Sequence, residues 1–188
     1  MDNRLAMFED NPIIAAVKNE RQLQAAIKTD CNIIFFLFGN ICNIAQLVKK
    51  AKDAGKKAFV HLELTTGLAG KEIAVDFIKS FTMADGVISI KPNLIRRAKA
   101  LGMLTVLRVF VVDSLALTNI VKQLEACDAD IVEVMPGVMP KIIKRVSGMV
   151  NVPIIVGGLI TDKEDIVNAL SAGARCVSTT CEAAWIDF

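Results

Sequence analysis

The chain has 188 residues, 53% of them hydrophobic, and a formal net charge of +2 at pH 7. This length fits one domain. The near balance of charge gives no electrostatic footprint for nucleic acid, although a local basic patch could still contact RNA. The apolar runs are shorter than the roughly 18 to 20 residues that a membrane-spanning helix needs, so no membrane association is predicted.

The cysteines and the first residues of the chain indicate the cellular compartment in which the protein works. There are five cysteines, an odd number, and no two of them have the CxxC spacing. A disulfide framework or a zinc site is therefore not expected, which favours a reducing environment. The first residues, MDNRLAMFEDN, contain no apolar segment of the kind that a signal peptide has. We therefore expect a cytoplasmic protein.

Short β-branched or aromatic runs alternate with amphipathic stretches along the chain. The expected strands are residues 13–17, 33–38, 58–62, 86–90, 104–108, 131–134, 153–156 and 175–178. The expected helices are residues 21–28, 43–54, 70–80, 94–101, 114–127, 140–150 and 162–172. Strands that alternate with helices in this way predict a parallel sheet.

Eight strands with helical crossovers predict a closed (βα)8 barrel of the TIM type, built as a single domain over residues 1–188. Such barrels usually have at least about 200 residues, so the loops should be short and the last helix abbreviated. A doubly wound open sheet is the alternative. It is disfavoured because no GxGxxG motif follows the first strand, where a dinucleotide-binding fold would place it.

Helix ends carry their own signals. Gly55, Gly102 and Gly173 each follow a helical stretch, where a residue in the left-handed conformation often ends a helix. Thr161 or Asp162 is the expected N-cap of the last expected helix, and Thr161 with Glu164 has the spacing of a capping box. These residues support the boundaries given above.

A phosphate-binding site is predicted after the last two strands. Gly157 and Gly158 follow the seventh strand, and Ser178, Thr179 and Thr180 follow the eighth. Glycines let the backbone approach a phosphate closely, and the next helix start presents free N–H groups. Barrels often bind phosphate in this pair of loops. The alternative is a tight turn beside an ordinary cluster of capping hydroxyls.

Ionisable side chains stand at the carboxyl ends of other strands, where barrel proteins collect their functional groups. His61, the only histidine, and Glu63 are two residues apart and should share one face of a strand. Glu133, Arg108 and Lys91 occupy similar positions on other strands. A histidine with two carboxylates can bind a metal or transfer protons. A buried hydrogen-bonded network is the equally weighted alternative.

One loop and three basic stretches have two interpretations each. In EVMPGVMPK (133–141) a rigid loop around Gly137 suits backbone contact with a small ligand, or simply stiffens the loop. Basic stretches at 91–99, 49–57 and 139–145 are first interpreted as solvated helix faces, with contact to RNA phosphates as the alternative. The chain has no tyrosine and one tryptophan, which argues against a stacking platform for RNA bases.

Four segments together resemble one known family. They are VHLELTTGL (60–68), DGVISIKPNLIRRAKALGMLTVLRVFVVDSLAL (85–117), IVEVMPGVMPKII (131–143) and VPIIVGGLITDKEDI (152–166). In these segments the chain resembles the glycerol-3-phosphate-responsive antiterminators of bacterial glycerol uptake operons. One departure is Glu63, which stands where family members often have an aspartate.

The resemblance implies a regulator and no enzyme. Such a protein would sense glycerol 3-phosphate, bind leader mRNA and prevent premature transcription termination. GGLI and STT would hold the phosphate, and His61, Glu63, Arg108 and Glu133 would line the ligand pocket. The resemblance calls for no cofactor, and a homodimer is a possible assembly, because two copies could combine weak basic patches.

Two other functions remain open at this point. One is an isomerase, epimerase or aldolase that acts on a small phosphorylated substrate, with His61 or Glu63 as acid–base residue and Lys91 or Arg108 as electrophilic helper. A Schiff-base mechanism is not expected, because no lysine lies inside an expected strand. The other is a metabolite-binding protein whose only macromolecular partner is a protein. Fold alone does not decide among these functions.

Overall fold

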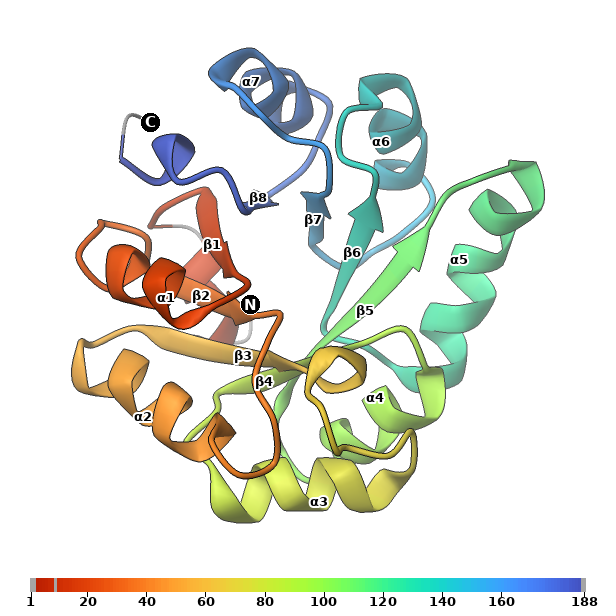
Figure 1. Cartoon of the computed structure of the whole chain (residues 1–188). Coiled ribbons are helices and arrows are strands. Elements are labelled where there is room, and N and C mark those ends of the chain that lie inside the picture. Colours follow the sequence, from red (N-terminus) through yellow and green to blue (C-terminus); the bar gives the residue numbers. More distant parts are fainter. Residues whose placement is uncertain (1–2, 9, 187–188) are drawn as a thin grey trace.

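The fold is a closed barrel of eight parallel strands in the order β1 to β8, surrounded by helices (Figure 1). The computed structural model describes residues 3–8 and 10–186. Strand β8 pairs with β1 and closes the barrel, with Ile14 opposite Ser178. The predicted single-domain TIM-type barrel is confirmed, and the open sheet is excluded.

The elements follow the predicted alternation closely. The strands are β1 (Ile13–Val17), β2 (Ile33–Phe36), β3 (Lys57–His61), β4 (Gly86–Ser89), β5 (Leu104–Phe110), β6 (Ile131–Met135), β7 (Ile154–Gly157) and β8 (Cys176–Thr179). The α-helices are α1 (Glu20–Ala26), α2 (Ile44–Asp53), α3 (Glu72–Phe81), α4 (Pro92–Ala100), α5 (Ser114–Cys127), α6 (Pro140–Ser147) and α7 (Lys163–Ser171). Short 3-10 helices are Asn3–Phe8, Leu62–Leu64 and Ala183–Trp185. The last of these stands in the place of an eighth helix, as the short chain predicts.

Side chains alternate between two apolar layers. Phe35 and Phe59 point into the barrel, where their ring centroids are 5.6 Å apart. Their neighbours Phe36 and Val60 face outward and pack under the helices. Because both faces of each strand are buried, the strands have continuous apolar sequences. Within the described ranges, no helix is both long enough and apolar enough to cross a lipid bilayer.

The chain leaves β3 earlier than predicted. Glu63 lies in the 3-10 turn Leu62–Leu64, so the prediction that it shares a strand face with His61 is wrong. The hydroxyl of Thr65 donates to the His61 carbonyl over 3.0 Å, and the Thr65 amide donates to the carbonyl of Leu62. These two hydrogen bonds close a helical turn directly after His61.

Helix α7 uses Asp162, one of its two predicted N-cap residues, but its capping interactions differ from the predicted box of Thr161 and Glu164. The side chain of Asp162, not Thr161, accepts a hydrogen bond from the Asp165 amide at 2.9 Å. In return, the Asp165 carboxylate accepts from the Thr161 amide at 3.0 Å. The side-chain cap thus lies one residue beyond Thr161, because Asp162 is the residue with extended backbone at the helix start, and Asp165 binds the amide of the residue before the cap.

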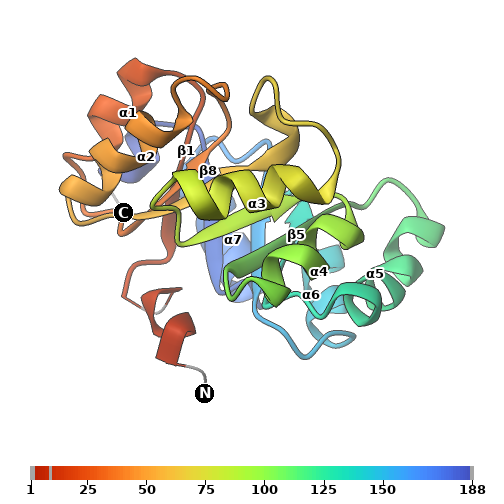
Figure 2. The same cartoon turned by 90° about the horizontal axis from the view of Figure 1, so that it is seen from below.

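Two aspartates brace the amino-terminal end of the barrel, which Figure 2 shows from the side. Asp85 precedes β4 and accepts from the Ala58 amide in β3 at 2.8 Å. Asp130 precedes β6 and accepts from both the amide and the hydroxyl of Thr105 in β5, at 3.0 and 2.8 Å. Asp130 also binds Lys99 at 2.6 Å, and its side chain is only 7% exposed. Each carboxylate therefore satisfies a strand amide and ties two neighbouring strands together.

Replacing Asp130 should destabilise the barrel. Asp130→Ala removes a carboxylate that accepts two hydrogen bonds from Thr105, so we expect a loss of about 2 to 3 kcal/mol in the free energy of unfolding. Urea unfolding followed by circular dichroism measures it. The matched control is Asp53→Ala, which breaks only the exposed pair with Lys49 and should cost less than about 0.5 kcal/mol. Equal losses in the two variants would contradict the bracing role.

Candidate functional site

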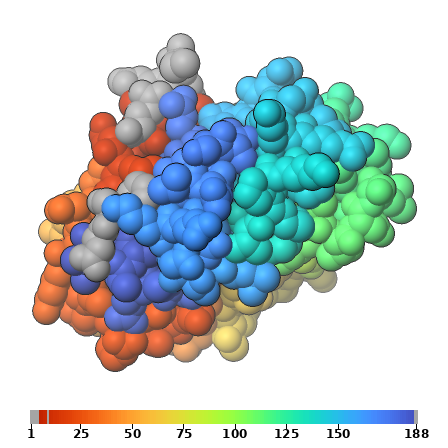
Figure 3. Space-filling view, turned by 90° about the horizontal axis from the view of Figure 1, so that it is seen from above, coloured from red at the N-terminus to blue at the C-terminus, as the bar shows by residue number. Residues whose placement is uncertain are grey.

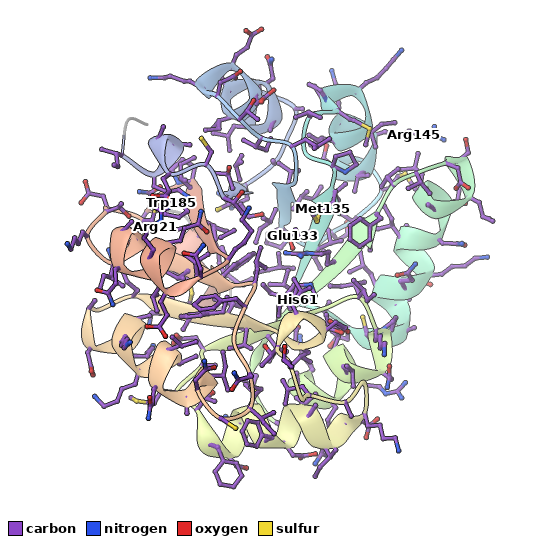
Figure 4. All side chains as sticks on the ribbon, viewed as in Figure 1. Arg21, His61, Glu133, Met135, Arg145 and Trp185 are labelled. Atoms are coloured by element: carbon purple, nitrogen blue, oxygen red, sulfur yellow. The ribbon has the colours of Figure 1, made fainter. Side chains whose placement is uncertain are left out.

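Four polar side chains converge inside the carboxyl end of the barrel. They are His61 from β3, Arg108 from β5, Glu133 from β6 and Ser178 from β8, and all are buried. Each lies two residues after an inward-facing apolar residue of its strand, so each points into the barrel. Figure 4 labels His61 and Glu133, which lie near the barrel axis. The structure thus brings together four of the predicted site residues.

Glu133 is the centre of this cluster. Arg108 Nε donates to Glu133 Oε2 at 2.6 Å, and Ser178 Oγ donates to Glu133 Oε1 at 2.6 Å. Arg108 and Glu133 are opposite each other in the register of β5 and β6. Glu133 has no exposed surface, so its charge depends on these partners for compensation.

The bond between Ser178 and Glu133 spans the intervening strand β7, and Gly157 makes room for it. A Cβ on Gly157 would lie 2.3 Å from Ser178 Oγ and 2.9 Å from Glu133 Oε1. Any side chain at this position would break the network. Gly157 ends β7 and therefore has a structural reason for being glycine, separate from the predicted contact with phosphate.

A small cavity opens above this floor, with a volume of about 90 Å³. Its lining includes most of the predicted phosphate residues together with Arg108. The lining residues are Ala16, Leu37, Arg108, Met135, Gly158, Leu159, Ile160, Ser178, Thr179 and Thr180. Gly158 and Leu159 both have positive φ, of 78° and 63°, which turns the loop over the cavity. The loops after β7 and β8 are tied together by the Thr179 hydroxyl, which donates to the Ile160 carbonyl.

Sequence reasoning missed three lining residues, Ala16, Leu37 and Met135. Met135 follows Glu133 by two positions and Leu37 follows Phe35 by two, so the strand alternation could have found them.

The start of α7 also differs from the expectation for an open anion site. The Asp165 amide of α7 donates to Asp162 and the Thr161 amide before the helix donates to Asp165, so neither of these amides is free for an anion.

Gly137 lies behind this cavity, where the loop after β6 meets the loop after β7. Its amide donates to the Gly158 carbonyl at 3.1 Å. A Cβ at Gly137 would approach the Gly157 amide nitrogen to 3.1 Å. Gly137 therefore permits close packing of the two loops.

Glu63 and Lys91 line a separate pocket of about 220 Å³ between the loops that follow β3 and β4. Glu63 Oε1 accepts from the Ser89 hydroxyl at 2.5 Å. The ammonium of Lys91 lies against Gly70, where a Cβ would be 2.1 Å from Nζ. The residues predicted to form one ligand site thus divide between two pockets.

His61 lies between Arg108 of the first pocket and Glu63 of the second, and its imidazole is neutral. Burial first, and the nearby Arg108 guanidinium second, lower the pKa of His61 from 6.5 to about 3. Its Nδ1 is 3.3 Å from Glu63 Oε2, but this contact is no ion pair because the ring is uncharged. Neither atom forms a hydrogen bond within the described residues.

The predicted metal-binding alternative for His61, Glu63 and Glu133 does not match this arrangement. Both oxygens of Glu133 are engaged by Arg108 and Ser178. No group of three histidine, cysteine, aspartate or glutamate side chains in residues 3–8 and 10–186 is placed to hold a metal ion. The alternative of a buried hydrogen-bonded network is the one that the structure supports for Glu133.

Comparison with known proteins gives relatives over almost the whole chain. The chain is 44% identical over 181 residues to the uncharacterized protein YgcP of Escherichia coli K12, covering 96% of this chain and 95% of that protein. It is also similar to the crystal structure of a glycerol uptake operon antiterminator regulatory protein from Listeria monocytogenes, with 30% identity and a TM-score of 0.91. That match covers 95% of this chain and 96% of the other.

A third relative is a glycerol uptake operon antiterminator-related protein from Thermotoga maritima, with 31% identity and a TM-score of 0.81. It is matched over 93% of this chain and 98% of its own. Two aldolase barrels also superimpose on this chain, at 12% and 16% identity, and a likeness at that level shows the fold alone.

The pattern of one family, described as the glycerol-3-phosphate responsive antiterminators, matches residues 13–185. The match spans all eight strands and the polar cluster inside the barrel mouth. This chain therefore belongs to the glycerol-3-phosphate responsive antiterminator family.

Proposed function

We propose that this chain is a cytoplasmic regulator that binds glycerol 3-phosphate and, in response, binds leader mRNA and prevents transcription termination of glycerol-utilisation genes. Membership of the family supports this function. The observation that carries the ligand assignment is the cavity between the loops after β7 and β8, with Arg108 in its wall. No catalytic step is part of the proposal.

The cavity suits a small anion. Its volume of about 90 Å³ is well below the roughly 300 Å³ at which pockets for drug-sized ligands begin. A guanidinium has five N–H donors, and Arg108 gives one of them to Glu133 through Nε. Its terminal nitrogens form no hydrogen bond with other described residues, which leaves directed donors for a phosphate. Because Glu133 neutralises the arginine, binding depends on these donors and the hydroxyls more than on net charge.

A Schiff-base reaction has little support at this site. The one strand lysine, Lys57, was not expected inside a strand, and it is the first residue of β3. It lies at the amino end of the barrel near Asp85, 3.7 Å away, and so at the opposite end from the cavity. Lys91 lines the other pocket. The arrangement favours ligand binding over carbonyl chemistry, although the aldolases share the fold.

Glycerol 3-phosphate should raise the melting temperature of the chain, because a ligand that binds only the folded state stabilises it by mass action. At about 100 times its Kd the gain is about 2.7 kcal/mol. Scanning calorimetry with glycerol 3-phosphate, inorganic phosphate and glycerol measures it. Glycerol 3-phosphate should give the largest shift and be recovered unchanged by phosphorus NMR. No shift, or conversion of the ligand, would overturn the proposed sensor.

Thr180 provides a milder test of the phosphate loops. It lines the cavity and is half-buried, so Thr180→Val removes a hydroxyl without leaving a buried partner unpaired. We expect the affinity for glycerol 3-phosphate to fall about 10-fold, the effect of one hydrogen bond to a charged group. Thr118→Val on the exposed face of α5 is the matched control and should leave titration calorimetry unchanged. Equal affinities in all three proteins would remove Thr180 from the site.

The neutral state of His61 has a measurable consequence in acid. Below pH 6.5 the unfolded chain takes up a proton on this ring, whereas the folded chain does so only near pH 3. Stability therefore falls as the pH drops through this window, by up to about 1.4 kcal/mol per pH unit. Between about pH 7 and about pH 5.5, the wild type should lose about 1 kcal/mol more than His61→Asn. Urea unfolding at both pH values tests this, and identical losses would mean that His61 titrates normally.

A further inference from the structure

The outer face of α6 is strongly basic. Lys141, Lys144 and Arg145 are all exposed, and their spacing places them within about 100° of one another around the helix. Figure 4 shows Arg145 on the outer side of α6, and Figure 3 shows this segment at the surface between α7 and α5. We call Lys141, Lys144 and Arg145 the α6 basic face.

The positive charge of the α6 basic face is not compensated. Within the described part of the chain, none of its three residues forms an ion pair. Residues 134–161, which contain the helix, include no aspartate or glutamate. Helix α2 also has three basic residues but is different, because Lys49 pairs with Asp53 and Lys50 pairs with Glu20. The net charge of the chain is only +2, but the α6 basic face carries three cations without an ion-pair partner among the described residues.

Helix α6 is also joined directly to the cavity. Strand β6 supplies Glu133 to the floor and Met135 to the wall. Two residues later the Gly137 amide donates to the Gly158 carbonyl of the opposite wall, at 3.1 Å. Pro140 then begins the helix. A ligand that repositions the loop at Gly158 therefore acts, through one hydrogen bond and three residues, on the start of α6.

We propose that the α6 basic face binds the phosphate backbone of RNA. This inference rests on the proposed function. It assigns an RNA contact to one of the basic stretches, for which the sequence allowed either a solvated helix face or a contact with RNA phosphates. Three unpaired cations on one helical face suit a polyanion, since neutralising its phosphates releases bound counterions. The connection through Gly137 explains why this face, among the basic stretches of the chain, would respond to a ligand in the barrel mouth.

The test removes the charges without touching the cavity. The triple variant Lys141→Gln, Lys144→Gln, Arg145→Gln is compared with the wild type for binding a labelled transcript of the leader upstream of its own gene, with glycerol 3-phosphate present. We expect at least about 10-fold weaker binding. The slope of log affinity against log salt should fall by about 2, since each phosphate contact on a single strand contributes about 0.7. The melting-temperature shift with glycerol 3-phosphate should remain, which shows that the variant is folded and occupied.

The matched control removes three exposed lysines elsewhere, with Lys28→Gln, Lys49→Gln and Lys50→Gln on the α1–α2 side of the barrel. It should bind RNA with nearly the affinity and salt slope of the wild type. If the α6 variant and this control bind equally well, the α6 basic face is not the RNA surface, and an acidic protein becomes the partner to test. If the wild type itself fails to bind the transcript, the proposed RNA function falls, and this inference falls with it.

Discussion

A carboxylate with no contact to solvent, Glu133, determines how the mouth of the barrel is built. The cost of burying that charge is met by Arg108 and Ser178, which approach its two oxygens from strands on either side. Ser178 can reach across β7 only because Gly157 has no side chain. The buried charge of Glu133 thus explains the residue types at three further positions, Arg108, Gly157 and Ser178, on three other strands.

The rim around this polar floor is apolar. Phe110 ends β5, whereas Ile90, Val112 and Leu159 follow the ends of β4, β5 and β7, and all four are exposed. Arg108 itself is buried below this rim, so its hydrogen bond to an anion bound as proposed would be stronger than in bulk water. The same conditions keep His61 neutral, since burial and the adjacent guanidinium both disfavour a second positive charge.

The sequence predicted the positions of all eight strands to within about two residues, because strands buried on both faces are continuous apolar runs. Where it failed, the deciding interaction came from another part of the chain. The expected end of β5 was Arg108. The strand in fact continues to Phe110, because Glu133 of β6 compensates the charge of Arg108. The turn at Glu63 depends on hydrogen bonds made by Thr65, which the spacing of His61 and Glu63 does not reveal.

The candidate site was predicted less completely than the fold, and for a physical reason. Glycines and hydroxyls at strand ends correctly indicated which loops surround the cavity. However, the pattern could not separate a glycine that makes room for a ligand from one that makes room for neighbouring atoms of the protein. Gly157 and Gly137 are of the second kind, since a Cβ on either would meet protein atoms.

The difference between the closely packed network and the loops that line the cavity matters for how a ligand could regulate the protein. A ligand shifts a conformational equilibrium only as far as its affinity differs between the two conformations. The network around Glu133 is closely packed and buried, so it should have nearly the same arrangement, and the same affinity for a ligand, in both conformations. The loop at Gly158 and Leu159 is different, because its residues line the cavity, reach the exposed rim and hold the Gly137 amide. If the proposed ligand shifts the barrel between two conformations, this loop is where its contacts would act, and α6 is the helix connected to it through the Gly137 amide.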